Sequence, residues 1–174
     1  MILQYRGTSF ISKVIEWFSW GVYSHTSWTF ATLVDGKLAG DTTEWESWTS
    51  NGVEHVAVIG KNHEKGTVID LYDLDRPLTI EEAELGTAFL QLQLKKKYDY
   101  RGILGFLLRE KTASSKKYFC SELIFDFLLH CGRTILLRVK PYQVSPQMIP
   151  MAPSLVYIGS IRAGEELKVR APWD

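Results

Sequence analysis

Apolar residues recur at helical spacing in three segments of the chain. Residues 8–20, 83–97 and 120–131 place apolar side chains three and four positions apart, as in a helix that packs one face on a core. The third segment begins at Cys120, and Gly132 supplies its stop. The pattern therefore predicts three helices, the last of which has a cysteine in its first turn.

Several shorter segments are rich in β-branched and aromatic residues and predict strands. Asp35-Gly36 lies between the first two strands and is the dipeptide of a tight hairpin. Prolines between residues 141 and 153 predict an irregular crossing before the last strand, and residues 103–108 are a candidate short helix. The predicted strands cover residues 22–33, 38–45, 54–59, 67–72 and 155–159, with 135–139 as a further candidate.

The hairpin gives a geometric expectation about two glutamates. If Asp35 and Gly36 are the turn residues, the strand pairing places Glu46 opposite His25 and Glu44 opposite Ser27. Side chains two positions apart share a face of the sheet, so either glutamate can reach the imidazole. A bulge in the hairpin would change the pairing.

The order of these elements predicts an α+β fold in a single domain of residues 1–174. Runs of strands are segregated from helices, which favours a curved antiparallel sheet or half-barrel of about five or six strands. The sheet is expected to pack against the helix that begins at Cys120. At 174 residues the chain is long enough to bury a full core.

Composition excludes several classes of function. Twenty basic and twenty acidic side chains give a formal charge of zero, so no global field attracts nucleic acid. Cys120 and Cys131 lie too far apart on one helix for a disulfide, and we expect two free thiols. No apolar run is long enough to span a membrane and no secretory signal is visible, so the expected location is the cytosol.

Three residue types in this chain match the needs of a cysteine hydrolase. A thiol at a helix N-terminus is stabilised as a thiolate, an imidazole holds it as an ion pair, and a carboxylate orients the imidazole. Cys120, His25 and either Glu44 or Glu46 supply these groups. The other three histidines, His55, His63 and His130, are expected to be structural or solvent-facing. The histidines show no metal-ligand spacing with the cysteines, so neither a metal nor an organic cofactor is expected.

Four motifs together resemble those of a known family. The motifs are Tyr23-Ser24-His25, residues 98–106, Phe119-Cys120-Ser121-Glu122-Leu123-Ile124, and the Ser-Pro and Ala-Pro steps at 145–146 and 152–153. Their order is typical of circularly permuted papain-like hydrolases. These are the YiiX and YaeF type, a branch of the NlpC-type cell-wall peptidase superfamily that includes lecithin retinol acyltransferase. The resemblance covers roughly residues 6–160.

The resemblance implies a permuted papain-like fold and a set of site residues. In the family the third catalytic member lies on the strand after the histidine, slightly closer to the turn than the directly opposite residue, which favours Glu44 over Glu46. Ser24, Tyr98 and Tyr118 are implied as pocket or oxyanion residues.

The implied function is a cysteine peptidase or amidase that cleaves an amide through an acyl-thioenzyme, with a cell-wall or other peptide as substrate. One alternative is a lipid-type acyltransferase or a thioester or ester hydrolase, which would use the same triad on an acyl group. Another is a non-catalytic binding module, for instance in a phage particle or an effector. A wall-directed enzyme made in the cytosol would need release by lysis, a secretion system or a virion, and the oligomeric state stays open.

Overall fold

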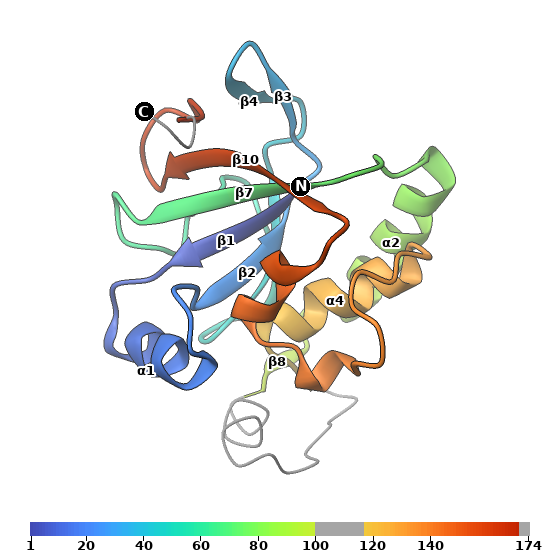
Figure 1. The fold of residues 1–174 in the computed structure, drawn as a ribbon, viewed down its shortest axis with the longest axis horizontal. Coiled ribbons are helices and arrows are strands. Elements are labelled where there is room, and N and C mark those ends of the chain that lie inside the picture. The colour runs from blue at the N-terminus through green and yellow to red at the C-terminus, as the bar shows by residue number, and fades with distance from the viewer. Residues whose placement is uncertain (100–116, 171–174) are drawn as a thin grey trace.

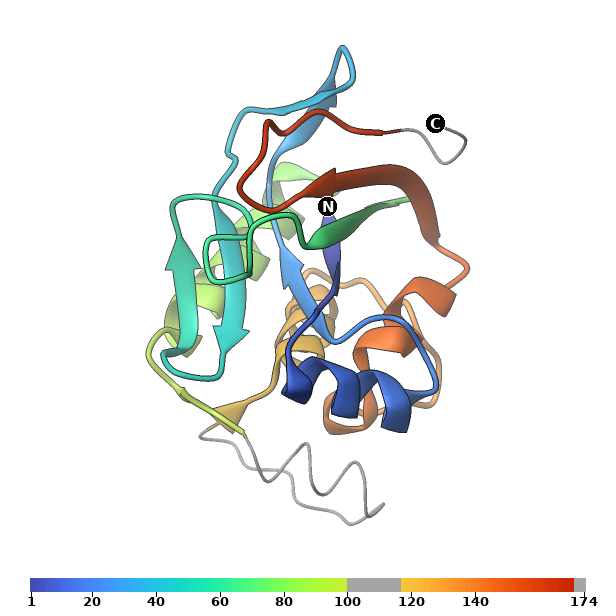
Figure 2. The same ribbon diagram turned by 90° about the vertical axis from the view of Figure 1, so that its left-hand side faces the viewer.

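A six-stranded antiparallel sheet is the main feature of the computed structural model, which describes residues 1–99 and 117–170. The strand order is β10-β7-β1-β2-β5-β6, so the N-terminal strand lies near the middle (Figure 1). Figure 2 shows β5 and β6 at one edge and β7 with β10 at the other. The strands are β1 (Ile2–Arg6), β2 (His25–Trp28), β5 (Glu44–Trp48), β6 (Gly52–Val56), β7 (Val68–Leu74) and β10 (Leu155–Arg162).

Helices and two small strand pairs complete the described part of the chain. The pair β3–β4 is an antiparallel hairpin, whereas β8 and β9 are parallel and two residues long. None of the described helices is long and apolar enough to cross a bilayer. The elements are α1 (Phe10–Ser19), β3 (Thr32–Val34), β4 (Lys37–Ala39), α2 (Ile80–Gln93), β8 (Lys97–Tyr98), β9 (Lys117–Tyr118), α4 (Cys120–His130) and the 3-10 turns η1 (Pro141–Gln143) and η2 (Pro146–Met151).

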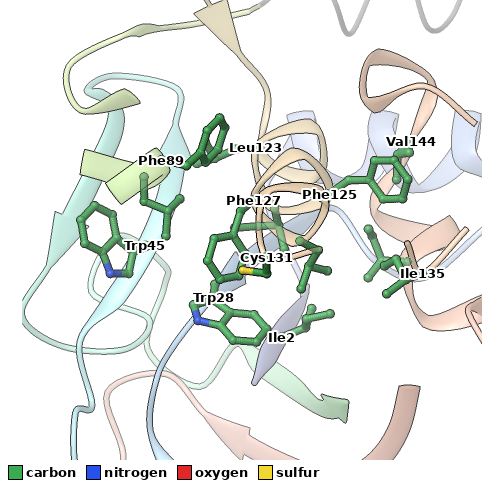
Figure 3. Close-up of a cluster of buried hydrophobic side chains, with 14 of the residues drawn as sticks. Ile2, Trp28, Trp45, Phe89, Leu123, Phe125, Phe127, Cys131, Ile135 and Val144 are labelled. Carbon is green, nitrogen blue, oxygen red and sulfur yellow. The ribbon is translucent and has the colours of Figure 1, made fainter. Parts of the chain in front are cut away.

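The main core lies between the sheet and two helices. Helix α4 packs on β2 and β5, and α2 packs on α4 (Figure 1). Trp28 and Trp45 of these strands belong to the same core cluster as Phe127 of α4 (Figure 3). The rings of Trp28 and Phe127 have centroids 4.8 Å apart. This packing fixes the position of α4, and therefore of its first residue, on the sheet.

The opposite face of the sheet is also buried. Along β1, Ile2 belongs to the helix-side core, whereas Leu3 and Tyr5 belong to a second cluster with Ile69 and Ile161. A strand covered on both faces reads as a continuous apolar run without alternation. This explains why alternation along residues 1–6 did not predict the central strand of the sheet.

The predicted hairpin forms, but its register changes before it reaches the site. Asp35 and Gly36 both have positive φ, 49° and 74°, as a two-residue turn of this kind requires, and Val34 pairs with Lys37. On the first arm of the hairpin Trp28 and Thr32 are four positions apart, whereas their partners on the second arm, Trp45 and Ala39, are six positions apart. The return chain therefore has two extra residues, which shifts every later pair.

Two other predictions need correction, and one lies outside the described residues. Residues 135–139 form no strand, and the chain continues through η1 and η2 instead. Helix α2 ends at Gln93, before the lysines at 95–97, because Lys95 takes a positive φ of 66° and Lys97 joins β8. The predicted helix at 103–108 lies outside the described residues. The α+β class and the antiparallel sheet are confirmed.

Candidate active site

Cys120 is the first residue of α4, as the apolar spacing predicted. The preceding residue, Phe119, is extended and provides no side-chain cap for the N–H groups of the first turn. These groups form the positive end of the helix dipole, at which Cys120 lies. Ser121 anchors this turn because its hydroxyl donates to the Val144 carbonyl at 2.6 Å. The contact with Val144 therefore fixes the start of the helix, and no side-chain cap occupies its first backbone N–H groups.

His25 begins β2 and contacts the thiol. Burial acts to lower the pKa of His25, but the Cys120 thiolate and the Glu46 carboxylate outweigh it and raise the pKa to about 10. Burial acts in the opposite sense on Cys120, yet the charge of His25 and hydrogen bonds from His25 and from the backbone of Thr26 and Ser121 lower the pKa of the thiol. The two residues stabilise each other as a thiolate and an imidazolium.

Glu46 is the carboxylate that lies beside the imidazole. Its Oε2 atom is 2.9 Å from His25 Nε2, and both side chains are almost fully buried. The distance makes an ion pair with a protonated His25, although the angles are not those of a hydrogen bond. The other carboxylate oxygen accepts from Asn62 Nδ2 at 2.8 Å. Because Nε2 faces Glu46, Nδ1 is the ring nitrogen left for Cys120.

The preference for Glu44 is corrected by these contacts. The Glu44 carboxylate accepts hydrogen bonds from the Tyr5 hydroxyl and, at 2.7 Å, from the Gly60 N–H. Burial, together with the charge of Glu46, raises the pKa of Glu44 to about 7. Glu44 therefore connects β5 to β1 and to the loop after β6, and does not touch the imidazole.

The three implied pocket residues are held by the surrounding backbone and by side chains. The Ser24 hydroxyl accepts from the Gly7 N–H at 3.0 Å, which joins the start of β2 to the end of β1. The Tyr118 hydroxyl donates to Asp126 of α4 at 2.9 Å, and Tyr98 is buried beside Tyr118 in the β8–β9 pair. Their roles in a pocket or an oxyanion hole stay predictions.

Two aromatic residues that were not among the predicted site residues, His63 and Trp48, complete the surroundings of His25. The rings of His63 and Tyr5 stack with centroids 3.8 Å apart, and His63 lies 5.0 Å from the His25 ring. Trp48 closes the group, 5.2 Å from His25 and 4.7 Å from His63. Burial, and then the charge of His25, lower the pKa of His63 to about 2, which keeps this imidazole neutral.

No signal in the sequence pointed to His63. It lies in a polar loop between two strands, flanked by Asn62 and Glu64, where a histidine is normally exposed to solvent. Only the folding of this loop over β5 and β1 brings it to the site.

Comparison with solved structures shows the fold. YiiX of Escherichia coli O157:H7, a DUF1105 protein described as a metalloprotein, matches with a TM-score of 0.64. The match covers 92% of this chain and 95% of the YiiX chain, at 18% sequence identity. No protein-family model and no curated protein sequence matches the chain. The chain therefore shares a YiiX-like α+β fold.

Proposed function

We propose that the protein is a cysteine hydrolase of the permuted papain-like, NlpC-type class, which cleaves an amide bond through an acyl-thioenzyme. The observation that carries the proposal is the contact between Cys120 and His25, in which the pKa of the thiol is lowered and that of the imidazole is raised to about 10. Reactive cysteines need this kind of environment, whereas structural buried cysteines are inert.

The geometry gives each residue a step. The Cys120 thiolate attacks the carbonyl carbon, and the charge that develops on the carbonyl oxygen meets N–H groups at the start of α4. The imidazolium of His25 then gives its proton to the leaving amine, which leaves an acyl group on the sulfur. A water molecule attacks this thioester, with His25 taking the proton of the water. Glu46 holds the imidazole in place and stabilises its charge throughout.

The substrate class rests on the family resemblance, which favours a cell-wall or other peptide. Mass spectrometry of the acyl group trapped on Cys120 distinguishes this class from lipid-type chemistry. A peptidyl or amino-acyl adduct supports the peptidase assignment, and a long fatty acyl adduct contradicts it. Either adduct shows a catalytic thiol and excludes a purely structural module.

The test of the thiolate is the pH profile of alkylation at Cys120, measured with a small neutral reagent and read peptide by peptide. Cys131 is the internal control, because burial raises its pKa to about 12. We expect Cys120 to react well below the ~8.5 of a free thiol and to lose this reactivity in His25→Ala.

The His25→Ala variant also controls for access to the buried sulfur. Removing the imidazole opens space around Cys120, so reactivity limited by access would rise in the variant. A fall therefore reports the loss of the ion pair. If Cys120 instead follows the profile of Cys131, the proposal fails and the binding-module alternative becomes the better one.

A further inference from the structure

Three buried atoms around His25 make no hydrogen bond of regular geometry among the described residues, and two of them, His25 Nε2 and Glu46 Oε2, face each other in the 2.9 Å ion pair. They are His25 Nε2, Glu46 Oε2 and His63 Nε2, one from each side chain of the group. A buried polar atom without a partner costs free energy, and most such atoms in folded proteins are satisfied. The three side chains also converge, because their ligand-type atoms all lie within 4.8 Å of one another.

The remaining contacts of the group hold it in this arrangement. Asn62 donates to Glu46 Oε1 at 2.8 Å, which leaves the second oxygen of that carboxylate directed at His25 Nε2. His63 is fixed by stacking on Tyr5, and its backbone N–H donates to the Gly60 carbonyl at 3.0 Å. Partners of this kind orient the ligands of metal sites in proteins.

We infer that His25, His63 and Glu46 form a binding site for a divalent transition-metal ion of the zinc type. Two imidazole nitrogens and one carboxylate oxygen are a donor set that zinc takes readily, with further positions open to water. Calcium and magnesium prefer oxygen ligands alone, so the two histidines argue against them.

The geometry is close to what zinc requires. Ligand bonds of ~2.0–2.1 Å in a tetrahedral site place the donor atoms roughly 3.4 Å apart. His25 Nε2 and Glu46 Oε2 are 2.9 Å apart, and the ligand atom of His63 lies within 4.8 Å of the other two side chains' ligand atoms.

Metal binding has a consequence for the thiol, and this consequence alone rests on the proposed function. An ion on His25 Nε2 takes the place of the proton that faces Glu46. The loaded site and the imidazolium that pairs with Cys120 therefore exclude each other. Zinc should act as a reversible inhibitor of the hydrolase, and the metal-free protein should be the active form.

The test is direct metal binding to the whole protein after chelator dialysis. Zinc is titrated by calorimetry, and cobalt by its visible absorbance, which reports the coordination geometry. We expect one equivalent to bind, and His63→Gln to weaken binding by more than about 100-fold, beyond the loss seen for an outer partner of a ligand. The matched control is His55→Gln, because His55 is exposed and hydrogen-bonds to Thr43 at 2.6 Å, away from this group.

X-ray absorption of the zinc-loaded parent protein identifies the ligands without any variant. A shell of two imidazoles and light-atom oxygen supports the site, whereas sulfur from Cys120 in that shell contradicts it. Failure to bind zinc at micromolar concentration, or equal affinity in parent and His63→Gln, overturns the inference in favour of a buried water molecule. Alkylation of Cys120 in metal-free protein tests the proposed function separately, so the two can fail independently.

Discussion

The two ends of helix α4 carry the two cysteines of the chain, and they differ in chemistry. Cys120 and Cys131 are equally buried, with 2% and 1% of their surfaces exposed, and neither forms a disulfide. Yet the pKa of Cys120 is lowered, while that of Cys131 is raised to about 12. Burial therefore does not decide the state of a thiol in this fold.

The difference lies in what surrounds each sulfur. Cys120 meets the imidazole of His25 and backbone donors at the positive end of the helix. Cys131 lies at the negative end, where burial and then the charge of Glu82 raise its pKa against a smaller opposing effect of Arg133. Its neighbours in the core are Phe127 and Gly86. A charged partner and the direction of the helix therefore favour the thiolate at one end and the neutral thiol at the other.

Replacing each cysteine by serine should give the largest difference between the two ends of the helix. Cys120→Ser should abolish labelling by an electrophilic peptide probe, by about 10³-fold or more, because a hydroxyl is not ionised by this environment. Cys131→Ser should keep the labelling rate but lose about 1–3 kcal/mol of unfolding free energy, since its hydroxyl is buried among apolar groups. Labelling kinetics and urea unfolding measure the two effects. Equal loss of labelling in both variants would contradict the assignment.

Variants of the two glutamates of β5 test which carboxylate supports the ion pair of Cys120 and His25. In Glu46→Gln the imidazolium loses a stabilising charge, so the pKa of His25 falls below about 10 and that of Cys120 rises. The pH range of fast alkylation should therefore begin at a higher pH. Near its lower limit, a thiol pKa that is higher by about one leaves roughly tenfold less thiolate to react, and the alkylation rate should fall in proportion.

Glu44→Gln is the matched control for this change. With a pKa of about 7, the Glu44 carboxyl is already partly neutral at pH 7, and the new amide can accept from Gly60 while it donates to the Tyr5 oxygen. The alkylation profile should stay close to that of the parent protein. A larger change in the profile of Glu44→Gln than in that of Glu46→Gln would return the role to Glu44.

The register of the hairpin explains which part of the site the sequence predicted. The spacing of apolar residues placed Cys120 at the start of α4, and the turn at Asp35-Gly36 formed as expected, because both depend on local conformation. The choice of glutamate depended on counting residues across the whole hairpin. Two extra residues between β4 and β5 were enough to change it.

The family geometry was compatible with the structure once the true register is used. Continuing the pairing of Trp28 with Trp45 places Trp48 opposite His25, and the ring contact between Trp48 and His25 agrees with this. The residue two positions closer to the turn is then Glu46. In this register the family expectation points to Glu46, and its role as a third catalytic member stays a prediction.

Long-range contacts account for what the sequence did not predict. His63 reaches the site only because its loop folds over β1 and β5, and β1 lies inside the sheet because it pairs with β2 on one side and β7 on the other. Neither fact leaves a periodic pattern in the residues concerned. Local spacing therefore predicted the position of Cys120 at the start of α4, whereas the groups around the imidazole required the three-dimensional fold.

The smallest expected effect tests the packing at the Cys131 end of α4. A Cβ atom on Gly86 of α2 would lie 2.4 Å from Cys131 Sγ and 2.4 Å from a ring carbon of Phe127, so both core side chains must move. Overpacking of this kind costs about 1–3 kcal/mol, against roughly 1 kcal/mol that alanine gains over glycine in a helix. Gly86→Ala should therefore lower the unfolding free energy by about 1 kcal/mol in urea, while Cys120 alkylation stays unchanged.

Glu84→Ala, exposed on the same helix, is the control and should change stability by less than about 0.5 kcal/mol. Because Cys120 lies at the other end of α4, a change in its reactivity in Gly86→Ala would show that the two ends are coupled through the helix, and that packing at Cys131 contributes to holding the nucleophile.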